Sequence, residues 1–272
     1  MSDLVTISVE NHVAYVKLNR AEKYNALNEE MFVGIVDAGR SVSADPSVRA
    51  VVLSGEGKGF CAGLDFESLM AIGDIASGQG LKFFNKPGGS PANYAQLVGY
   101  VWKQMPVPVI AAIHGAAYGG GFQLAMAADI RLTGTDARFS VMEIKWGLIP
   151  DMSGTQTLRD LVRLDVAKEL TFTGRVVGAK EAADLGLVTR ICENPFEAAA
   201  DMAKEIAGKS PDAITAGKQL LEKAWHGSSV DGLDLEARLQ KKIIGQANQI
   251  EAVMAAFENR PPAYKNRKLD IE

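Results

Sequence analysis

Two carboxylates stand near the ends of the mostly apolar stretch EIKWGLIPDM, residues 143 to 152. Glu143 opens the stretch, and Asp151 follows eight residues later. Gly147 and Pro150 disfavour one continuous helix across the interval, so a loop could fold both carboxyls toward one pocket. Apolar neighbours would raise the pKa of a carboxyl here by desolvation, which suits a base working near neutral pH. The stretch therefore indicates acid–base chemistry.

Each acid also has a structural interpretation. The sequence DMSGTQTL opens a helical pattern, so Asp151 could cap a helix or lie in a loop. Glu143 could form a solvent-exposed ion pair with Lys145. Cys61 has no evident histidine or basic partner nearby, which favours a small packed side chain over a nucleophile. His114, at the end of an apolar strand, is expected to be structural rather than catalytic.

Two glycine-bearing loops offer a second kind of chemistry. GEGKGFCAGLDF (55–66) and GAAYGGGFQLAMAADI (115–130) each follow an apolar strand, and ligands bind at that edge of open α/β sheets. The run Gly119-Gly120-Gly121 leads into a helical stretch, so its N–H groups would lack intrahelical acceptors and attract negative charge. One N–H from each loop could meet at a carbonyl oxygen and form an oxyanion hole. Plain connecting turns are the alternative, and neither a GxGxxG pattern nor a P-loop is present.

Composition narrows the class of protein. A chain of 272 residues can bury a substantial core as one large domain or two modest ones. The net charge of −4 is spread along the chain, so we expect no nucleic-acid partner. Cys61 and Cys192 lie far apart without metal-ligand spacing, which favours a reducing, cytoplasmic setting and no metal site. A signal-peptide pattern and a run of ~18 apolar residues are both missing, so we expect a soluble protein without a membrane partner.

The elements that must position these residues follow an α/β pattern. Alternating polarity at the start predicts two strands joined at Glu10-Asn11-His12, and Asn28 is a suitable helix start. Later apolar runs predict strands covered on both faces, as in a largely parallel sheet. The predicted strands are 4–9, 13–18, 48–55, 106–115 and 128–134, and a helix is predicted at 26–42.

The second half of the chain changes character. The Gly-, Ser-, Asn- and Pro-rich stretch 73–92 indicates a surface loop rather than a domain boundary. Strands cease near residue 195, so we divide the chain into a core at 1–194 and a helical region at 195–272. The predicted helices are 195–207, 211–224, 230–244 and 250–258, and the basic tail YKNRK follows them.

Several segments together resemble the crotonase superfamily, the enoyl-CoA hydratases and isomerases, nearly from end to end. The resemblance implies a spiral of ββα repeats with a helical C-terminal trimerisation region, assembled as a homotrimer or homohexamer. It also implies an acyl-CoA substrate in fatty-acid-type metabolism such as β-oxidation, and no cofactor, because coenzyme A is part of the substrate. The segments are NRAEKYNALN (19–28), GFCAGLDF (59–66), HGAAYGGGFQLAMAADIRL (114–132), GTQTL (154–158), TGRVVGAKEAADLGLV (173–188) and FENRPPAYKNR (257–267).

The resemblance also implies roles for particular residues. The N–H groups of Leu64 and Gly120 look like the oxyanion hole for the thioester carbonyl. The NRAEK segment, the FCAGLDF loop and the basic tail resemble the parts that hold adenine, pyrophosphate and ribose phosphate, and the tail could serve a neighbouring subunit. Asp65 could instead cap the helix that follows it. The coenzyme A contacts implied are Glu22, Lys23, Ala62, Gly63, Asp65 and Lys265.

One position departs from the hydratases of this superfamily, which resemble each other in two glutamates. Glu143 matches one of them, whereas the other is Gln123 here. A carboxamide does not exchange protons near neutral pH, so Gln123 would position water or substrate and simple hydration is disfavoured. Asp151 resembles an acid of the dienoyl-CoA isomerase branch, although that branch commonly carries Asp at position 123.

We therefore expect Glu143 and Asp151 to shift a double bond of an enoyl- or dienoyl-CoA through a thioester enolate. Two alternatives stay open. One is an enoyl-CoA hydratase in which Asp151 activates water, and the other is a non-catalytic acyl-CoA-binding member of the superfamily.

Overall fold

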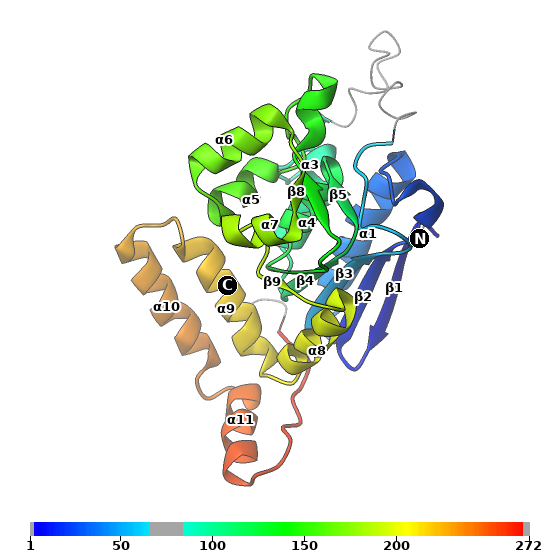
Figure 1. Cartoon of the computed structure of the whole chain (residues 1–272). Helices are drawn as coiled ribbons and strands as arrows, with labels where there is room; N and C mark the ends of the chain where they lie inside the picture. The colour runs from blue at the N-terminus through cyan, green and yellow to red at the C-terminus, as the bar shows by residue number, and fades with distance from the viewer. Residues whose placement is uncertain (1–2, 66–83, 269–272) are drawn as a thin grey trace.

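The structure, a computed structural model, describes residues 3–65 and 84–268. Among them, strands and helices alternate until about residue 191 and helices follow (Figure 1). The strands are β1 Val5–Glu10, β2 Val13–Leu18, β3 Ala50–Gly55, β4 Val109–Ile113, β5 Ala116–Tyr118, β6 Ile130–Thr133, β7 Arg138–Ser140, β8 Val177–Gly178 and β9 Arg190–Ile191. The helices are η1 Ala21–Lys23, α1 Glu29–Ala44, α3 Tyr94–Lys103, α4 Gly120–Met126, η4 Met142–Trp146, α5 Gly154–Leu161, α6 Leu164–Thr173, α7 Ala179–Leu185, α8 Pro195–Ala207, α9 Pro211–Ala224, α10 Ser229–Ile243 and α11 Ala247–Phe257.

The main sheet has the order β1-β2-β3-β4-β6-β9, and a smaller sheet has the order β5-β7-β8. β1 and β2 pair antiparallel through a turn at Asn11 and His12, both with positive φ. The other neighbours in the main sheet pair in parallel, which confirms the predicted α/β class and the largely parallel sheet. We did not predict β5, β7, β8 and β9, because two or three residues are too few to show a strand pattern.

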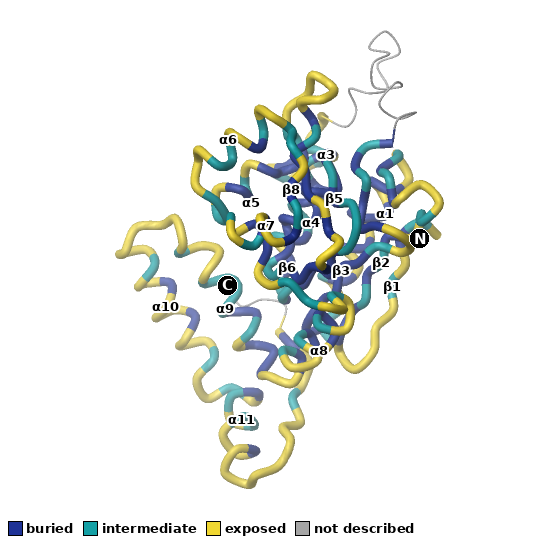
Figure 2. The backbone as a smooth tube through the Cα atoms, in the orientation of Figure 1, coloured by how far each residue is buried: buried dark blue, intermediate teal, exposed yellow. Residues whose placement is uncertain are grey.

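The main sheet is covered on both faces, as its apolar strands predict. On β3, Val51 and Leu53 join the larger core with α1 and α3, whereas Ala50 and Val52 face α8. The inner strands β2, β3, β4 and β6 are accordingly buried along most of their length, whereas the edge strand β1 is largely exposed (Figure 2).

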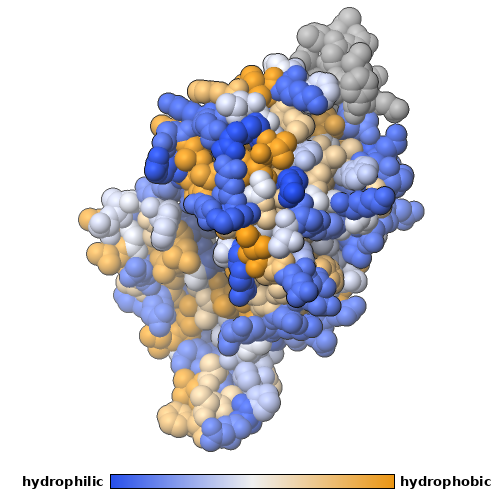
Figure 3. Space-filling view, viewed as in Figure 1, coloured by the Kyte–Doolittle hydropathy of each residue, from blue (hydrophilic) through white to orange (hydrophobic). Residues whose placement is uncertain are grey.

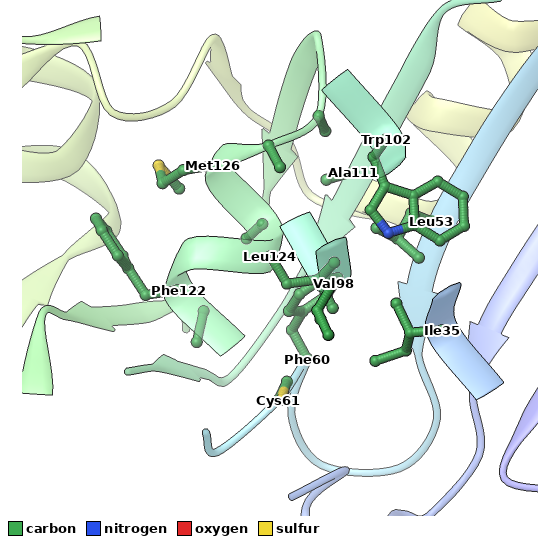
Figure 4. Close-up of a cluster of buried hydrophobic side chains, with 14 of the residues drawn as sticks. Ile35, Leu53, Phe60, Cys61, Val98, Trp102, Ala111, Phe122, Leu124 and Met126 are labelled. Carbon is green, nitrogen blue, oxygen red and sulfur yellow. The ribbon is translucent and has the colours of Figure 1, made fainter. Parts of the chain in front are cut away.

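Helix α4 lies inside the larger core. Figure 4 shows Leu124 directed toward Val98 and Phe60, while Phe122 and Met126 lie on the other side of this helix. All of its residues from Gly120 to Met126 are buried. This helix therefore carries Gln123 and the glycine run on a rigid support.

The first long helix begins later than predicted. α1 starts at Glu29, with the Asn28 side chain accepting from the Met31 N–H at 2.9 Å, so the expected start signal is confirmed. The predicted helical residues before Asn28 are wrong, because Leu27 pairs with the 63–65 loop instead. Its N–H donates to the Gly63 carbonyl at 2.8 Å, and its carbonyl accepts from the Asp65 N–H at 3.0 Å.

The four C-terminal helices match their predicted positions within three residues at either end. α8 packs across the main sheet through Ala199, Ala203 and Ala207. α9 and α10 pack on each other around the small cluster Ala216, Leu235 and Leu239. The helical region thus contacts the core through α8 and also through Lys218 of α9, which pairs with Asp129 at 2.7 Å. The division at residue 195 stays a prediction.

Two buried arginines join the tail to the core. Arg267 is 3% exposed and donates to the carbonyls of Ser43 in the last turn of α1 and of Asp45 and Val48 just after it. Arg49 donates to Ala207 at 3.1 Å and to Tyr264 at 3.0 Å, again at carbonyl oxygens. The tail therefore folds back onto its own chain. No helix among residues 3–65 and 84–268 has the length and apolar character to cross a bilayer.

Candidate active site

The two glycine-bearing loops lie against each other. The Cys61 N–H donates to the Ala116 carbonyl at 2.9 Å, and the Tyr118 N–H donates to the Cys61 carbonyl at 3.0 Å. Gly63 has φ +91°, and a Cβ there would lie 2.6 Å from the Tyr118 carbonyl oxygen and 3.5 Å from the Gly120 nitrogen. Only glycine permits this approach.

The predicted oxyanion donors come from these adjacent loops. The bridge between Leu27 and Leu64 uses the N–H groups of Leu27 and Asp65, which leaves that of Leu64 without an acceptor among the described residues. Gly120 begins α4, where the first N–H groups have no intrahelical acceptor. Both N–H groups are therefore available to an oxygen that carries negative charge.

Glu143 is buried, with 8% of its surface exposed. Its Oε1 accepts from Gln123 Nε2 at 2.6 Å, while Oε2 is buried without a partner among the described residues. A Cβ on Gly119 would lie 3.6 Å from Oε1, so the carboxyl sits beside the glycine run. The ion-pair interpretation is wrong, because Lys145 lies over the Trp146 ring, 5.1 Å from its centre.

Asp151 is half-buried in the loop between η4 and α5. Gly147 has φ +69° and ends η4, which confirms that no single helix links the two acids. The helix-cap interpretation of Asp151 is wrong, since the N-cap of α5 is Ser153.

Burial raises the pKa of both carboxyls. It is the largest cause for Glu143, and the negative charge of Asp151 raises the pKa of Glu143 further. The hydrogen bond from Gln123 opposes this by lowering the Glu143 pKa. Burial is also the largest cause of the raised Asp151 pKa. The two acids of the EIKWGLIPDM stretch are thus close enough for the charge of one to act on the pKa of the other.

Gln123 connects the parts of this site. It is 1% exposed, and its Oε1 accepts from the N–H groups of Met152 at 2.8 Å and Gly154 at 2.9 Å. Its Nε2 donates to Glu143, so one amide bridges Glu143 and the turn after Asp151. These contacts to the protein itself were not predicted.

The predicted coenzyme A residues fall into two groups. Glu22 and Lys23 lie exposed in η1, beside the loop that contains Ala62 and Gly63, because the Ala62 N–H donates to the Tyr24 carbonyl at 2.9 Å. Lys265 instead lies with Asn248 of α11, whose side chain accepts from the Lys265 N–H at 2.8 Å.

Asp65 is held by Arg20, a residue that the sequence reasoning missed. Arg20 Nη1 donates to Asp65 Oδ2 at 2.7 Å and to the Ala26 carbonyl at 2.9 Å. Both side chains are mostly buried, so this ion pair fixes the 61–65 loop against the segment after β2. The helix expected after Asp65 lies outside the described residues, as does the part of the predicted 73–92 loop before residue 84.

Asn25 is a second missed residue that supports this loop. Its Nδ2 donates to the carbonyls of Glu56, Gly59 and Phe60, and its Oδ1 accepts from the Arg20 N–H. The Cys61 thiol donates to the Asn25 carbonyl, and burial raises the pKa of this thiol to about 12, so the interpretation of Cys61 as a packed residue is confirmed. His114 Nε2 lies 2.9 Å from the Gly57 carbonyl oxygen, a structural contact.

Comparisons with known proteins agree with this geometry. The family model for enoyl-CoA hydratase/isomerase matches residues 8–267. The mitochondrial Delta(3,5)-Delta(2,4)-dienoyl-CoA isomerase of Rattus norvegicus is 36% identical over 267 residues, which cover 93% of this chain and 79% of that protein. The (E)-benzylidenesuccinyl-CoA hydratase of Thauera aromatica is 35% identical over 272 residues, which cover 96% of this chain and 98% of that protein. The crystal structure of an enoyl-CoA hydratase from Bacillus anthracis has a TM-score of 0.87 at 28% identity, with 97% of this chain and 99% of that chain covered.

Proposed function

Because the chain belongs to the enoyl-CoA hydratase/isomerase family of the crotonase superfamily, whose members act on acyl-CoA thioesters, we propose that this enzyme shifts a double bond of an enoyl- or dienoyl-CoA. The proton-transfer groups in this proposal are Glu143 and Asp151. The observation that carries it is a buried carboxyl, Glu143, that lies beside the glycine run at the start of α4, with a second acid, Asp151, whose charge acts on it and a carboxamide at position 123.

The geometry supports a two-acid proton shift. The thioester carbonyl oxygen would accept from the N–H groups of Leu64 and Gly120, which stabilise the negative charge of an enolate. One carboxyl removes a proton at one end of the unsaturated system, and the electron pair moves toward the carbonyl oxygen. The other carboxyl, in its protonated form, returns a proton at the far end as the double bonds move. Protons and electrons balance, and no cofactor is required, because coenzyme A is part of the substrate.

The second candidate is hydration of a 2-enoyl-CoA. Relatives named as hydratases, including the (E)-benzylidenesuccinyl-CoA hydratase, favour it at a similar level of identity. In that reaction Asp151 would activate water and Glu143 would deliver the proton. Gln123 weighs against it, because its amide is occupied by protein contacts and does not exchange protons near neutral pH.

The experiment that separates the two reactions offers the purified protein a 3,5-dienoyl-CoA and a 2-enoyl-CoA side by side. Diene absorbance and product mass are followed in deuterated water. A 2,4-diene that has gained deuterium without the mass of water supports the isomerase. Hydration of the 2-enoyl-CoA with the diene untouched refutes it.

We also propose a homotrimer or homohexamer in the cytoplasm. Large apolar side chains are exposed along α9 to α11, where Figure 3 shows hydrophobic surface. They include Leu221, Trp225, Val230, Leu233 and Phe257. Cys61 and Cys192 are free thiols, as expected in a reducing compartment. Light scattering of the purified protein measures the mass of the assembly.

A further inference from the structure

We propose that Gln123 is a positioning residue, an amide clamp that holds Glu143 by one oxygen and leaves the other oxygen to transfer the proton. This inference rests on the proposed function, because it assigns the work of proton transfer to Glu143. It differs from the expectation that Gln123 positions water or substrate.

The orientation of the Gln123 amide is fixed by its partners. The N–H groups of Met152 and Gly154 can only donate, so the atom facing both must be the amide oxygen. The nitrogen then faces Glu143 Oε1 at 2.6 Å, where a carboxylate accepts. Each of the three hydrogen bonds therefore requires the same orientation of the amide.

The clamp strengthens the bond that Glu143 receives. The Gly154 N–H opens α5, and the partial positive charge at a helix start polarises the Gln123 carbonyl. Hydrogen bonds in a chain polarise one another in a buried site, so Nε2 becomes a better donor. This donor stabilises the carboxylate of Glu143 against the burial that raises its pKa.

The clamp also determines which carboxyl oxygen of Glu143 is left to transfer the proton. Oε1 is occupied by Gln123, whereas Oε2 is buried without a partner among the described residues. A glutamate at position 123 with the same backbone contacts would place a second carboxyl oxygen about 2.6 Å from Oε1. Two carboxyls that close share a proton and titrate as a pair. The carboxamide therefore lets Glu143 titrate as a single base at this end of the site.

Gly154 completes the clamp from the opposite side. A Cβ on Gly154 would lie 2.6 Å from Gln123 Oε1 and 3.0 Å from its Cδ and Cγ, so the buried amide would have to move. Gly154→Ala thus displaces the clamp without changing its chemistry, and alanine suits a helix better than glycine.

The test compares Gln123→Met, Gly154→Ala and Gln123→Glu with Gln156→Met. The last is a matched control, since Gln156 is also a helical glutamine, on α5, but among the described residues its side-chain nitrogen donates to the Thr155 hydroxyl rather than to a carboxylate. The Glu143 carboxyl is titrated by ¹³C NMR in substrate-free protein, with Glu143→Gln to assign its signal. Turnover is measured as a function of pH.

Gln123→Met and Gly154→Ala are expected to raise the Glu143 pKa and to move the acid limb of the pH–rate profile to higher pH. Asp151, the described group whose charge also acts on Glu143, is unchanged in both. Misplacement of the base is expected to lower kcat on the order of 10²-fold with little change in KM. Gln123→Glu is expected to split the Glu143 titration into two steps, and Gln156→Met to match the wild type.

If Gln123→Met folds and its Glu143 carboxyl titrates with the same pKa as in the wild type, the proposed clamp is refuted. If that variant does not fold, the same result in Gly154→Ala overturns it. The titration needs no turnover, so it is independent of the proposed reaction. A wild-type protein that leaves the diene untouched refutes the isomerase, while the clamp still stands or falls by the carboxyl titration.

Discussion

Replacing Gly63 with alanine is expected to pull apart the two loops that supply the oxyanion donors. The new Cβ would lie 2.6 Å from the Tyr118 carbonyl oxygen, which is backbone and cannot turn aside. Ordinary van der Waals contact begins at 3.4 Å, so the loops must separate by about 0.8 Å, the difference of these distances. Leu64, the next residue, moves with Gly63.

The size of the effect follows from this displacement. Misplacing a catalytic group by about 1 Å costs on the order of 10²-fold in rate, and losing one oxyanion donor costs about 3 kcal/mol. We expect kcat to fall on the order of 10²-fold. The positive φ of Gly63 adds a folding cost of roughly 1–2 kcal/mol for alanine.

The assay is steady-state conversion of saturating acyl-CoA substrate, with thermal unfolding measured in parallel. Gly245→Ala is the matched control, because Gly245 has φ +76° but a Cβ there would meet nothing within 4 Å. Both variants lose stability through the backbone strain, and only Gly63→Ala is expected to lose kcat. A folded Gly63→Ala enzyme with kcat within about threefold of wild type would refute the role of the Leu64 N–H.

Three further outcomes are expected. Glu143→Gln should abolish solvent deuterium incorporation and lower kcat by about 10²- to 10⁴-fold, and retained exchange would exclude Glu143 as the essential base. Burial raises the Glu143 pKa above 4.5, and a base must be deprotonated to act, so kcat/KM should fall as the pH decreases through that raised pKa. A decrease of kcat/KM that sets in only at or below pH 4.5 contradicts the role of Glu143 as the base. Arg20→Met removes the ion pair of the mostly buried Asp65 and should destabilise the fold, by at most about 3–5 kcal/mol, with Arg20→Met/Asp65→Asn recovering part of the loss; equal unfolding of the single and double variants would show that the pair matters little.

Much of the fold could be predicted because its signals are local. Asn28 caps α1 through a residue three positions away, and Pro195 and Pro211 open α8 and α9 at their first turns. The start of α1 was predicted three residues early because the pairing of Leu27 with the 63–65 loop depends on residues more than 30 positions away. Helical spacing alone carries no information on such a contact.

The candidate site shows the same limit more sharply. Glu143 and Asp151 stood out as acids in an apolar stretch, and the glycine run marked a helix start. The role of Gln123 was hidden, because its three partners lie 20, 29 and 31 residues away and act only after the chain has folded. Arg267 shows the converse: a basic tail suggested a phosphate site, whereas the structure uses this arginine inside its own subunit.

The buried arginines Arg49 and Arg267 affect how the helical arm, α9 to α11, unfolds locally. α8 holds the arm at one end through the main sheet, and Lys218 pairs with Asp129 to hold α9 against the core. Arg49 and Arg267 hold the other end near α1, more than 200 residues away in sequence. Closing so long a loop is entropically unfavourable, so these contacts are expected to form late in folding. A segment fastened at both ends does not fray from its tip. The arm is therefore expected to exchange its amide hydrogens as one cooperative unit, at the free energy needed to release the arginines together with the Lys218–Asp129 pair.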